Sequence, residues 1–217
     1  MKIHKKVLIL SDSVALPRNE PERCVYEETW PHLLKQDGDY TIHQVSIGGA
    51  TSVDLLGQIN YHIPFNPDIV ILHVGVVDCA PRFMSKIELG IMKRIPVIGK
   101  KVIGLMNNNR VRQARKITYV SINQFENNVR AILSHFKDKL IFVISIVPAP
   151  VAYEQLLPGI TENINNYNEV LRKCSNFIPL DGIGSDALMS DYHHINGLGH
   201  KYIFEALTHE LNNKLER

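Results

Sequence analysis

The sequence has few cysteines and no long apolar run. Its three cysteines, Cys24, Cys79 and Cys174, are odd in number and widely separated, which argues against a disulfide framework and indicates a reducing compartment. They also lack the spacing of a zinc site. No apolar segment approaches the roughly 20 residues of a membrane-spanning helix, and the run at 7–10 is too short for the core of a signal peptide. These absences predict a soluble, cytoplasmic protein.

Acidic residues are nearly absent from the segment 82–116. It holds ten of the 24 basic residues and one acid, Glu88, so its net charge is +9 and that of the remaining chain is −7. A solvated charged face would explain this asymmetry, and so would a surface that meets something anionic. The basic residues are not interleaved with the aromatic side chains that stack on bases, so nucleic acid is not an expected partner.

The apolar residues, 45% of the chain, can form one sizeable core, and we expect a single domain over 1–217. Strand-length apolar runs alternate with helix-length segments, which predicts a parallel sheet covered by helices on both faces. The predicted strands are 6–10, 41–46, 68–74, 140–147 and 176–180. The predicted helices are 21–35, 52–59, 121–136, 162–174 and 197–215.

An insertion at about 82–118 follows the third predicted strand and is too long for an ordinary connection between a strand and a helix. In its helical stretches, apolar residues such as Ile91, Ile98 and Leu105 alternate with lysines and arginines. Two roles fit this pattern. The insertion is a cap whose apolar face packs on the domain, or residues 86–116 contact a membrane surface or an amphiphilic substrate. The sequence does not fix the oligomeric state.

Two segments at opposite ends of the chain carry the side chains of a nucleophile and its base. Asp191 precedes His194 by three residues and can accept a hydrogen bond from its Nδ1–H, which leaves Nε2 free to take a proton from an alcohol. Ser13 follows the first predicted strand. Because ligand sites of parallel sheets lie beyond the carboxyl ends of the strands, the fold can bring this hydroxyl to a histidine. A helix cap is the alternative role for an Asp-Ser pair after a strand.

Four short blocks resemble those of the SGNH/GDSL hydrolases. Residues 11–13, Ser-Asp-Ser, resemble the Gly-Asp-Ser block of that family, and 48–51, 75–78 and 191–194 resemble its second, third and closing blocks. The resemblance implies an α/β fold with three α/β/α layers and a flavodoxin-like, parallel five-stranded sheet, here with a basic, partly helical insertion after the third strand. It also implies a serine ester hydrolase that needs neither a metal nor an organic cofactor.

The same resemblance assigns roles to individual residues. It implies that Ser13, His194 and Asp191 form a catalytic triad and that the N–H groups of Ser13 and Gly49 bind the oxyanion. The family normally has an asparagine donor where this chain has Val77. Loss of one such donor typically costs about 3–4 kcal/mol, or roughly 100- to 1,000-fold in rate. Either Arg82 replaces it, or the enzyme is slow, or hydrolysis has been lost.

The substrate is less well determined by the sequence. Candidate substrate contacts are Asp12, His73, Asp78 and Arg82, although His73 also fits a buried structural role. The variant block at 75–82 resembles that of SGNH proteins associated with bacterial surface-polysaccharide synthesis, and the basic insertion favours an anionic substrate. We therefore expect an O-acetyl or similar ester on a carbohydrate or a glycan precursor. The alternatives are a lipid esterase or acyltransferase with the same triad, and a noncatalytic glycan-binding module.

Overall fold

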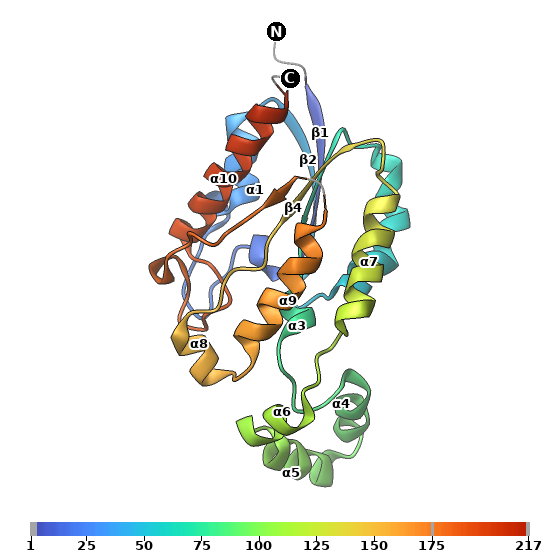
Figure 1. Cartoon of the computed structure of the whole chain (residues 1–217), viewed down its shortest axis with the longest axis vertical. Helices are drawn as coiled ribbons and strands as arrows, with labels where there is room; N and C mark the ends of the chain where they lie inside the picture. Colours follow the sequence, from blue (N-terminus) through green and yellow to red (C-terminus); the bar gives the residue numbers. More distant parts are fainter. Residues whose placement is uncertain (1–3, 175, 216–217) are drawn as a thin grey trace.

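A parallel, five-stranded sheet forms the centre of the computed structural model, which describes residues 4–174 and 176–215 (Figure 1). The strand order is β2-β1-β3-β4-β5. Every described pairing is parallel, and β1 aligns with β2 from Lys5 opposite Tyr40 to Ser11 opposite Ser46. The strands are β1 Lys5–Ser11, β2 Tyr40–Ser46, β3 Ile69–His73, β4 Leu140–Ile144 and β5 Phe177–Ile178.

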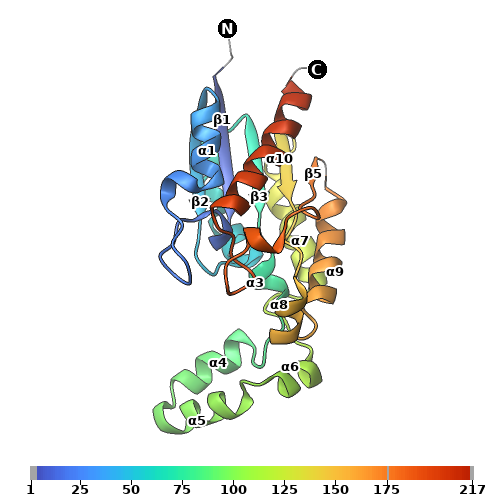
Figure 2. The same cartoon turned by 90° about the vertical axis from the view of Figure 1, so that its left-hand side faces the viewer.

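Helices cover both faces of this sheet, so the predicted three-layer α/β/α fold is confirmed (Figure 2). On one face pack α1 (Trp30–Asp37) and α10 (Gly197–Leu215). On the other pack α2 (Ser52–Gln58), α7 (Ile122–Ser134) and α9 (Ile160–Arg172).

Two hydrophobic cores result from the alternation of side chains along each buried strand. In β1, Val7 and Ile9 join the core beneath α1 and α10, whereas Leu8 and Leu10 join the core beneath α2, α7 and α9. All four side chains are almost completely buried. This two-sided burial explains why the strand is a continuous apolar run in the sequence.

The structure corrects several predicted boundaries. The first helix was expected over 21–35, but it begins only at Trp30, because Thr29 occupies the cap position and Pro31 fits the first turn. Two short helices were not predicted, α3 (Val76–Cys79) and α8 (Val151–Leu156). Both are less than two turns long, so they carry little periodic signal. Short 3₁₀ helices occur at Ser13–Ala15, Tyr26–Glu28, Ile59–Tyr61, Ile63–Phe65 and Ser185–Ala187.

The basic insertion projects from the end of the molecule at which the strands finish (Figures 1 and 2). It contains α4 (Lys86–Lys93), α5 (Pro96–Met106) and α6 (Asn109–Arg115). Its two ends meet in an antiparallel bridge, where the Arg82 N–H donates to the Ile117 carbonyl at 2.8 Å. Arg115 donates to both carboxylate oxygens of Glu88, at 2.7 and 3.0 Å, and so ties α6 to α4. No helix in the described residues is long and apolar enough to cross a bilayer.

Candidate active site

Ser13 lies where the chain leaves β1 and turns into a 3₁₀ helix. The Asp12 side chain caps this turn by accepting the Val14 N–H at 3.0 Å. The Ser13 Oγ lies 2.9 Å from Nε2 of His194, a residue 181 positions later in the chain. The fold therefore brings the proposed nucleophile and base into hydrogen-bond contact.

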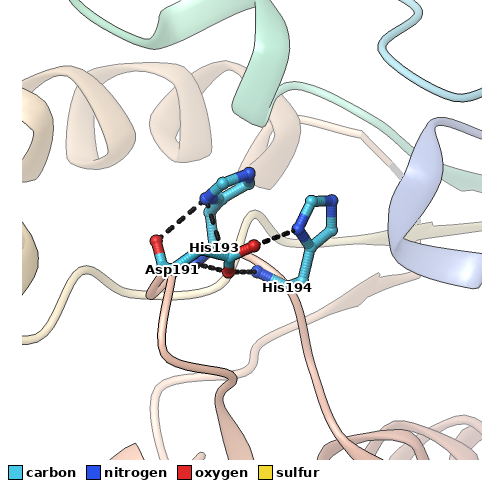
Figure 3. A group of neighbouring side chains, drawn as sticks. All are labelled: Asp191, His193 and His194. Atoms are coloured by element: carbon cyan, nitrogen blue, oxygen red, sulfur yellow. Dashed lines mark hydrogen bonds and ion pairs between the residues drawn. The ribbon is translucent and has the colours of Figure 1, made fainter. Parts of the chain in front are cut away.

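Asp191 fixes the orientation of the His194 ring (Figure 3). Its Oδ2 lies 2.6 Å from Nδ1 of His194, and its Oδ1 accepts the backbone N–H groups of His193 and His194 at 3.2 and 3.0 Å. An ionised carboxylate only accepts hydrogen bonds, so Nδ1 of a neutral His194 must carry the proton and Nε2 must accept from Ser13. This is the tautomer that a general base needs.

The Asp191 carboxylate is held in its charged form. Partial burial by itself would raise its pKa, but hydrogen bonds from the His194 ring and backbone, together with the nearby His193 and His194 rings, outweigh that effect. The pKa of Asp191 is consequently well below the ordinary value of an aspartate. It can stabilise an imidazolium without taking its proton.

The two expected backbone donors for an oxyanion are unoccupied by protein groups. Gly49 follows the end of β2 with φ of +71°, and its surroundings are open. Ser13 follows the end of the neighbouring strand β1. Within the described residues, neither N–H donates to another group of the chain. Both can therefore donate to a ligand at the carboxyl edge of these strands.

The third expected donor is missing, as the sequence indicated. Val77 is half-buried and packs against the apolar core. Arg82 lies beside it, because the Arg82 Nη2 donates to the Val77 carbonyl at 3.2 Å. The guanidinium also stacks on the Tyr119 ring, with its carbon 4.2 Å from the ring centroid. Arg82 Nε is buried and has no hydrogen-bond partner in the described part of the chain.

A cleft of about 600 Å³ separates the insertion from the body of the protein. It is lined by Arg82, Asn107, Asn108, Asn109, Arg112, Tyr153, Leu156, Leu157, Asp191 and His193. The Arg112 guanidinium donates to the side chains of Asn107 and Asn109 and lies over the Phe83 ring. Among described residues, neither Arg82 nor Arg112 pairs with a carboxylate. The cleft thus has two arginines that form no ion pair, together with the carboxylate of Asp191.

A second, much smaller cavity of about 10 Å³ lies behind the same loop. Its walls are mainly apolar but include two fully buried polar residues, Asp12 and His73. Burial raises the pKa of Asp12 to about 7, and burial together with nearby His200 lowers the pKa of His73 to about 3. Both shifts favour the neutral forms. A cavity of this size holds one group no larger than a water molecule or a methyl.

The other candidate residues have structural surroundings. Asp78 is fully buried, and its carboxylate accepts hydrogen bonds from the N–H and the hydroxyl of Ser52 at 2.9 and 2.6 Å. These bonds fix the start of α2. Asp78 lines neither of the two cavities described above. Cys79 is fully buried too, and burial raises its thiol pKa far above the ordinary value. The Nδ1 of His200 accepts the Trp30 N–H and joins α10 to α1.

Asp191, His193 and His194 also form the one group in the described chain that could hold a metal ion, with ligand atoms within 4.8 Å of one another (Figure 3). However, Asp191 Oδ2 and His194 Nδ1 already bind each other, and Asp191 Oδ1 accepts two backbone N–H groups. A metal would have to displace these bonds. The three residues fit the orientation of an imidazole better than they fit a metal.

Two residues near the site gave no signal in the sequence. Arg18 donates to the Ser13 carbonyl at 3.3 Å and so supports the turn that carries the hydroxyl. Tyr153, on α8, stacks on the His193 ring at 5.9 Å between centroids with an 18° interplanar angle. Neither lies in a block with a recognisable pattern. Their positions depend on loop conformations that only the folded chain defines.

Comparisons with known proteins place this geometry in context. A model of the GDSL-like Lipase/Acylhydrolase family matches residues 25–202, which includes Asp191 and His194 but not Ser13. A search of curated proteins finds no significant match.

Several solved structures share the fold. A lipase/acylhydrolase from Enterococcus faecalis has a TM-score of 0.68 at 16% identity, with 97% of this chain and 96% of that chain covered. A catalytic mutant of Axe2, an acetylxylan esterase from Geobacillus stearothermophilus, has 0.61 at 16% identity, with 97% and 96% covered. The esterase EstA from Pseudoalteromonas sp. has 0.61 at 15% identity, with 98% and 100% covered. At these identities the likeness establishes the architecture.

Proposed function

The chain belongs to the GDSL-like lipase/acylhydrolase family, and from that premise we propose that it is a serine esterase with Ser13 as nucleophile, His194 as general base and Asp191 as the group that orients the base. One observation carries the proposal. The hydrogen-bonded series from Ser13 Oγ to His194 Nε2 and from His194 Nδ1 to Asp191 has spacings of 2.9 and 2.6 Å. Spacings of this kind allow proton transfer between the groups.

The reaction proceeds in two halves. The Ser13 Oγ attacks the ester carbonyl carbon while Nε2 of His194 takes the hydroxyl proton, and Asp191 stabilises the resulting imidazolium. The tetrahedral intermediate then expels the alcohol, which leaves with the proton from His194, and the acyl group remains on Ser13. In the second half, a water molecule attacks this ester as His194 takes its proton. The acid departs, and the proton returns to Ser13.

The oxyanion is bound by the N–H groups of Ser13 and Gly49, with Arg82 in place of the missing asparagine. Val77 cannot donate, but Arg82 donates to its carbonyl and lines the cleft that contains Asp191 and His193. A guanidinium at this position opposes the negative charge that develops on the oxyanion.

We propose a small acyl group, with acetyl as the first candidate. The cavity of about 10 Å³ behind the Asp191 loop does not set this limit, because Ser13, Gly49 and His194 do not line it. The structural similarity to an acetylxylan esterase supports an acetyl ester on a carbohydrate. Arg112 favours an acidic glycan, because its guanidinium forms no ion pair in the described chain and lines the larger cleft, where the alcohol part of the substrate would lie.

Hydrolysis of p-nitrophenyl acetate tests the triad. We expect Ser13→Ala and His194→Ala to lower kcat by at least about 10⁴-fold, and Asp191→Asn by about 10³- to 10⁴-fold. Ser190→Ala is the matched control, since Ser190 is an exposed serine next to the same loop and should leave kcat unchanged. Equal rates in Ser13→Ala and the parent would remove the catalytic proposal and leave a noncatalytic binding module.

Chain-length comparison tests the acyl group. We expect kcat/KM to fall steeply from the acetyl ester to the butyrate and octanoate esters of p-nitrophenol. A rise with chain length would instead favour a lipid esterase. Product analysis with added sugar acceptors separates the two outcomes of the acyl-enzyme, since acetylated sugar would identify a transferase.

A further inference from the structure

The outward surface of α4 and α5 is apolar and basic, and nothing in the described chain covers it. Of the fourteen exposed large apolar side chains in the described residues, six lie within residues 87–105. We call this surface the hairpin face; it consists of Ile87, Ile91, Val97, Ile98 and Leu105, with Lys93, Lys100 and Lys101 among them. Figure 2 shows the two helices at the end of the molecule, away from the sheet.

The side of α5 that faces away from α4 carries apolar side chains, and packing within the protein does not explain them. At 100° per residue, Gly99, Ile103 and Met106 fall on one side of the helix, and this side faces α4, because a Cβ at Gly99 would lie 1.8 Å from the Met92 carbonyl oxygen. Val97 and Leu105 fall on the opposite side and are 70% and 79% exposed. A helix that only capped the domain would carry polar residues there.

The insertion also has almost no core of its own. Among the residues from 85 to 119 whose burial is described, only Gly99 is buried. The apolar side chains of the hairpin face thus remain in water and lose the free energy that burial would supply. An exposed apolar surface of this kind is typical of a site that binds a membrane or another molecule.

The charges select the kind of partner. Within the described chain, Lys93, Lys100 and Lys101 pair with no carboxylate. The segment 82–116 has a net charge of +9, while the rest of the chain has −7. Two copies meeting through this face would bring like charges together. An anionic surface attracts the insertion and repels the body, so it also orients the molecule.

We propose that the hairpin face binds the surface of a membrane that contains anionic phospholipids. Ile87, Val97, Ile98 and Leu105 enter the interface between headgroups and acyl chains, while the lysines extend their charged ends to the phosphates. The binding is peripheral. The large cleft, which Asn107, Asn108, Asn109 and Arg112 of the insertion line, then lies beside the membrane. This inference does not depend on the esterase proposal.

Sedimentation with vesicles tests the inference. We expect the protein to sediment with vesicles of about three parts phosphatidylcholine to one part phosphatidylserine, and to be released by salt. The double variants K100E/K101E and I98S/L105S should each lower the partition coefficient at least about tenfold. The matched control K137E/K214E has the same change in charge on two exposed lysines outside the insertion, in the turn before β4 and in the last turn of α10, and should bind like the parent.

The thermal unfolding midpoint of each variant shows whether it is folded. Release of the unmodified protein from vesicles by salt tests the electrostatic contribution to binding without any substitution. The inference is overturned if the parent does not sediment, if pure phosphatidylcholine vesicles bind it equally, or if K137E/K214E loses binding as much as K100E/K101E. It is also overturned if light scattering shows that the hairpin face joins two copies and vesicles do not compete with that contact.

Discussion

At the scale of single residues, the site combines one carboxylate held in its charged form with one whose ionisation is disfavoured by burial. Asp191 is paired with His194 and has a lowered pKa, whereas Asp12, one residue before Ser13, is completely buried and has a pKa of about 7. One oxygen of Asp12 has no hydrogen-bond partner in the described chain. The turn that presents Ser13 therefore contains a carboxyl group whose ionisation is unfavourable for the folded protein.

The raised pKa of Asp12 predicts how the free energy of unfolding depends on pH. The folded chain holds the Asp12 proton more tightly than the unfolded chain, whose pKa is near 3.8, so this stabilisation is complete below pH 4 and is lost as the pH rises through 7. Asp12→Asn keeps the acceptor for the Val14 N–H but cannot ionise. Relative to the parent, we expect its free energy of unfolding to rise by about 2–3 kcal/mol from pH 5 to pH 8.

Urea unfolding at the two pH values measures this change. Asp138→Asn, which removes an exposed carboxyl in the turn between α7 and β4, is the control and should follow the parent. A constant difference between Asp12→Asn and the parent would mean that Asp12 is ionised throughout the range.

Arg82 allows a second test at this scale. If its guanidinium replaces the missing asparagine donor, Arg82→Gln should lower kcat for p-nitrophenyl acetate by about 10²-fold and change KM little. Arg82→Lys, which retains the charge, should restore part of the loss. A change in KM alone would place Arg82 in substrate binding and leave Val77 without compensation.

At the scale of elements, the sheet could be predicted from the sequence and the connections could not. Strands buried on both faces are continuous apolar runs, and helices such as α7 and α10 are long enough for their pattern to be recognised. The predicted α10 matches the observed Gly197–Leu215. A single cap residue decides where α1 starts, and a single turn decides whether α3 and α8 form. Segments this short are compatible with several conformations, so the sequence does not distinguish among them.

In the candidate site, too, the residues at the strand ends could be predicted and the contacts of their side chains could not. Ser13, Asp191 and His194 lie in short blocks at the carboxyl edge of the sheet, where topology alone brings them together. By contrast, the sequence could not reveal that the Asp78 carboxylate binds Ser52 or that Arg18 supports the Ser13 carbonyl. These contacts depend on which way a side chain points.

The packing of α4 on α5 depends on one glycine. We expect Gly99→Ala to separate the two helices, because the new Cβ would overlap the Met92 carbonyl oxygen. Gly104→Ala is the matched control, as no atom lies within 4 Å of its Cβ position, and it should stabilise α5 by about 0.5–1 kcal/mol. Amide hydrogen exchange over 86–106 should therefore become faster in Gly99→Ala and slower in Gly104→Ala. Equal protection in both variants would contradict the close approach.

At the scale of the whole molecule, the body and the insertion are joined at a neck where Arg82 and Ile117 pair, and two surface contacts add to it, from Lys86 to Asp54 and from Asn109 to the Leu156 carbonyl. We expect replacement of residues 86–114 by a short glycine-serine turn to keep the unfolding midpoint within a few degrees, since the described part of that segment contributes almost no buried side chain. Hydrolysis of p-nitrophenyl acetate should persist and vesicle binding should disappear. Loss of cooperative unfolding would show that the insertion belongs to the core.

The 181 positions between Ser13 and His194 have a consequence for biosynthesis. The Ser13 hydroxyl is therefore synthesised long before the His194 imidazole. A copy interrupted before residue 194 lacks the proposed base, so its hydroxyl has no group in place to accept the proton.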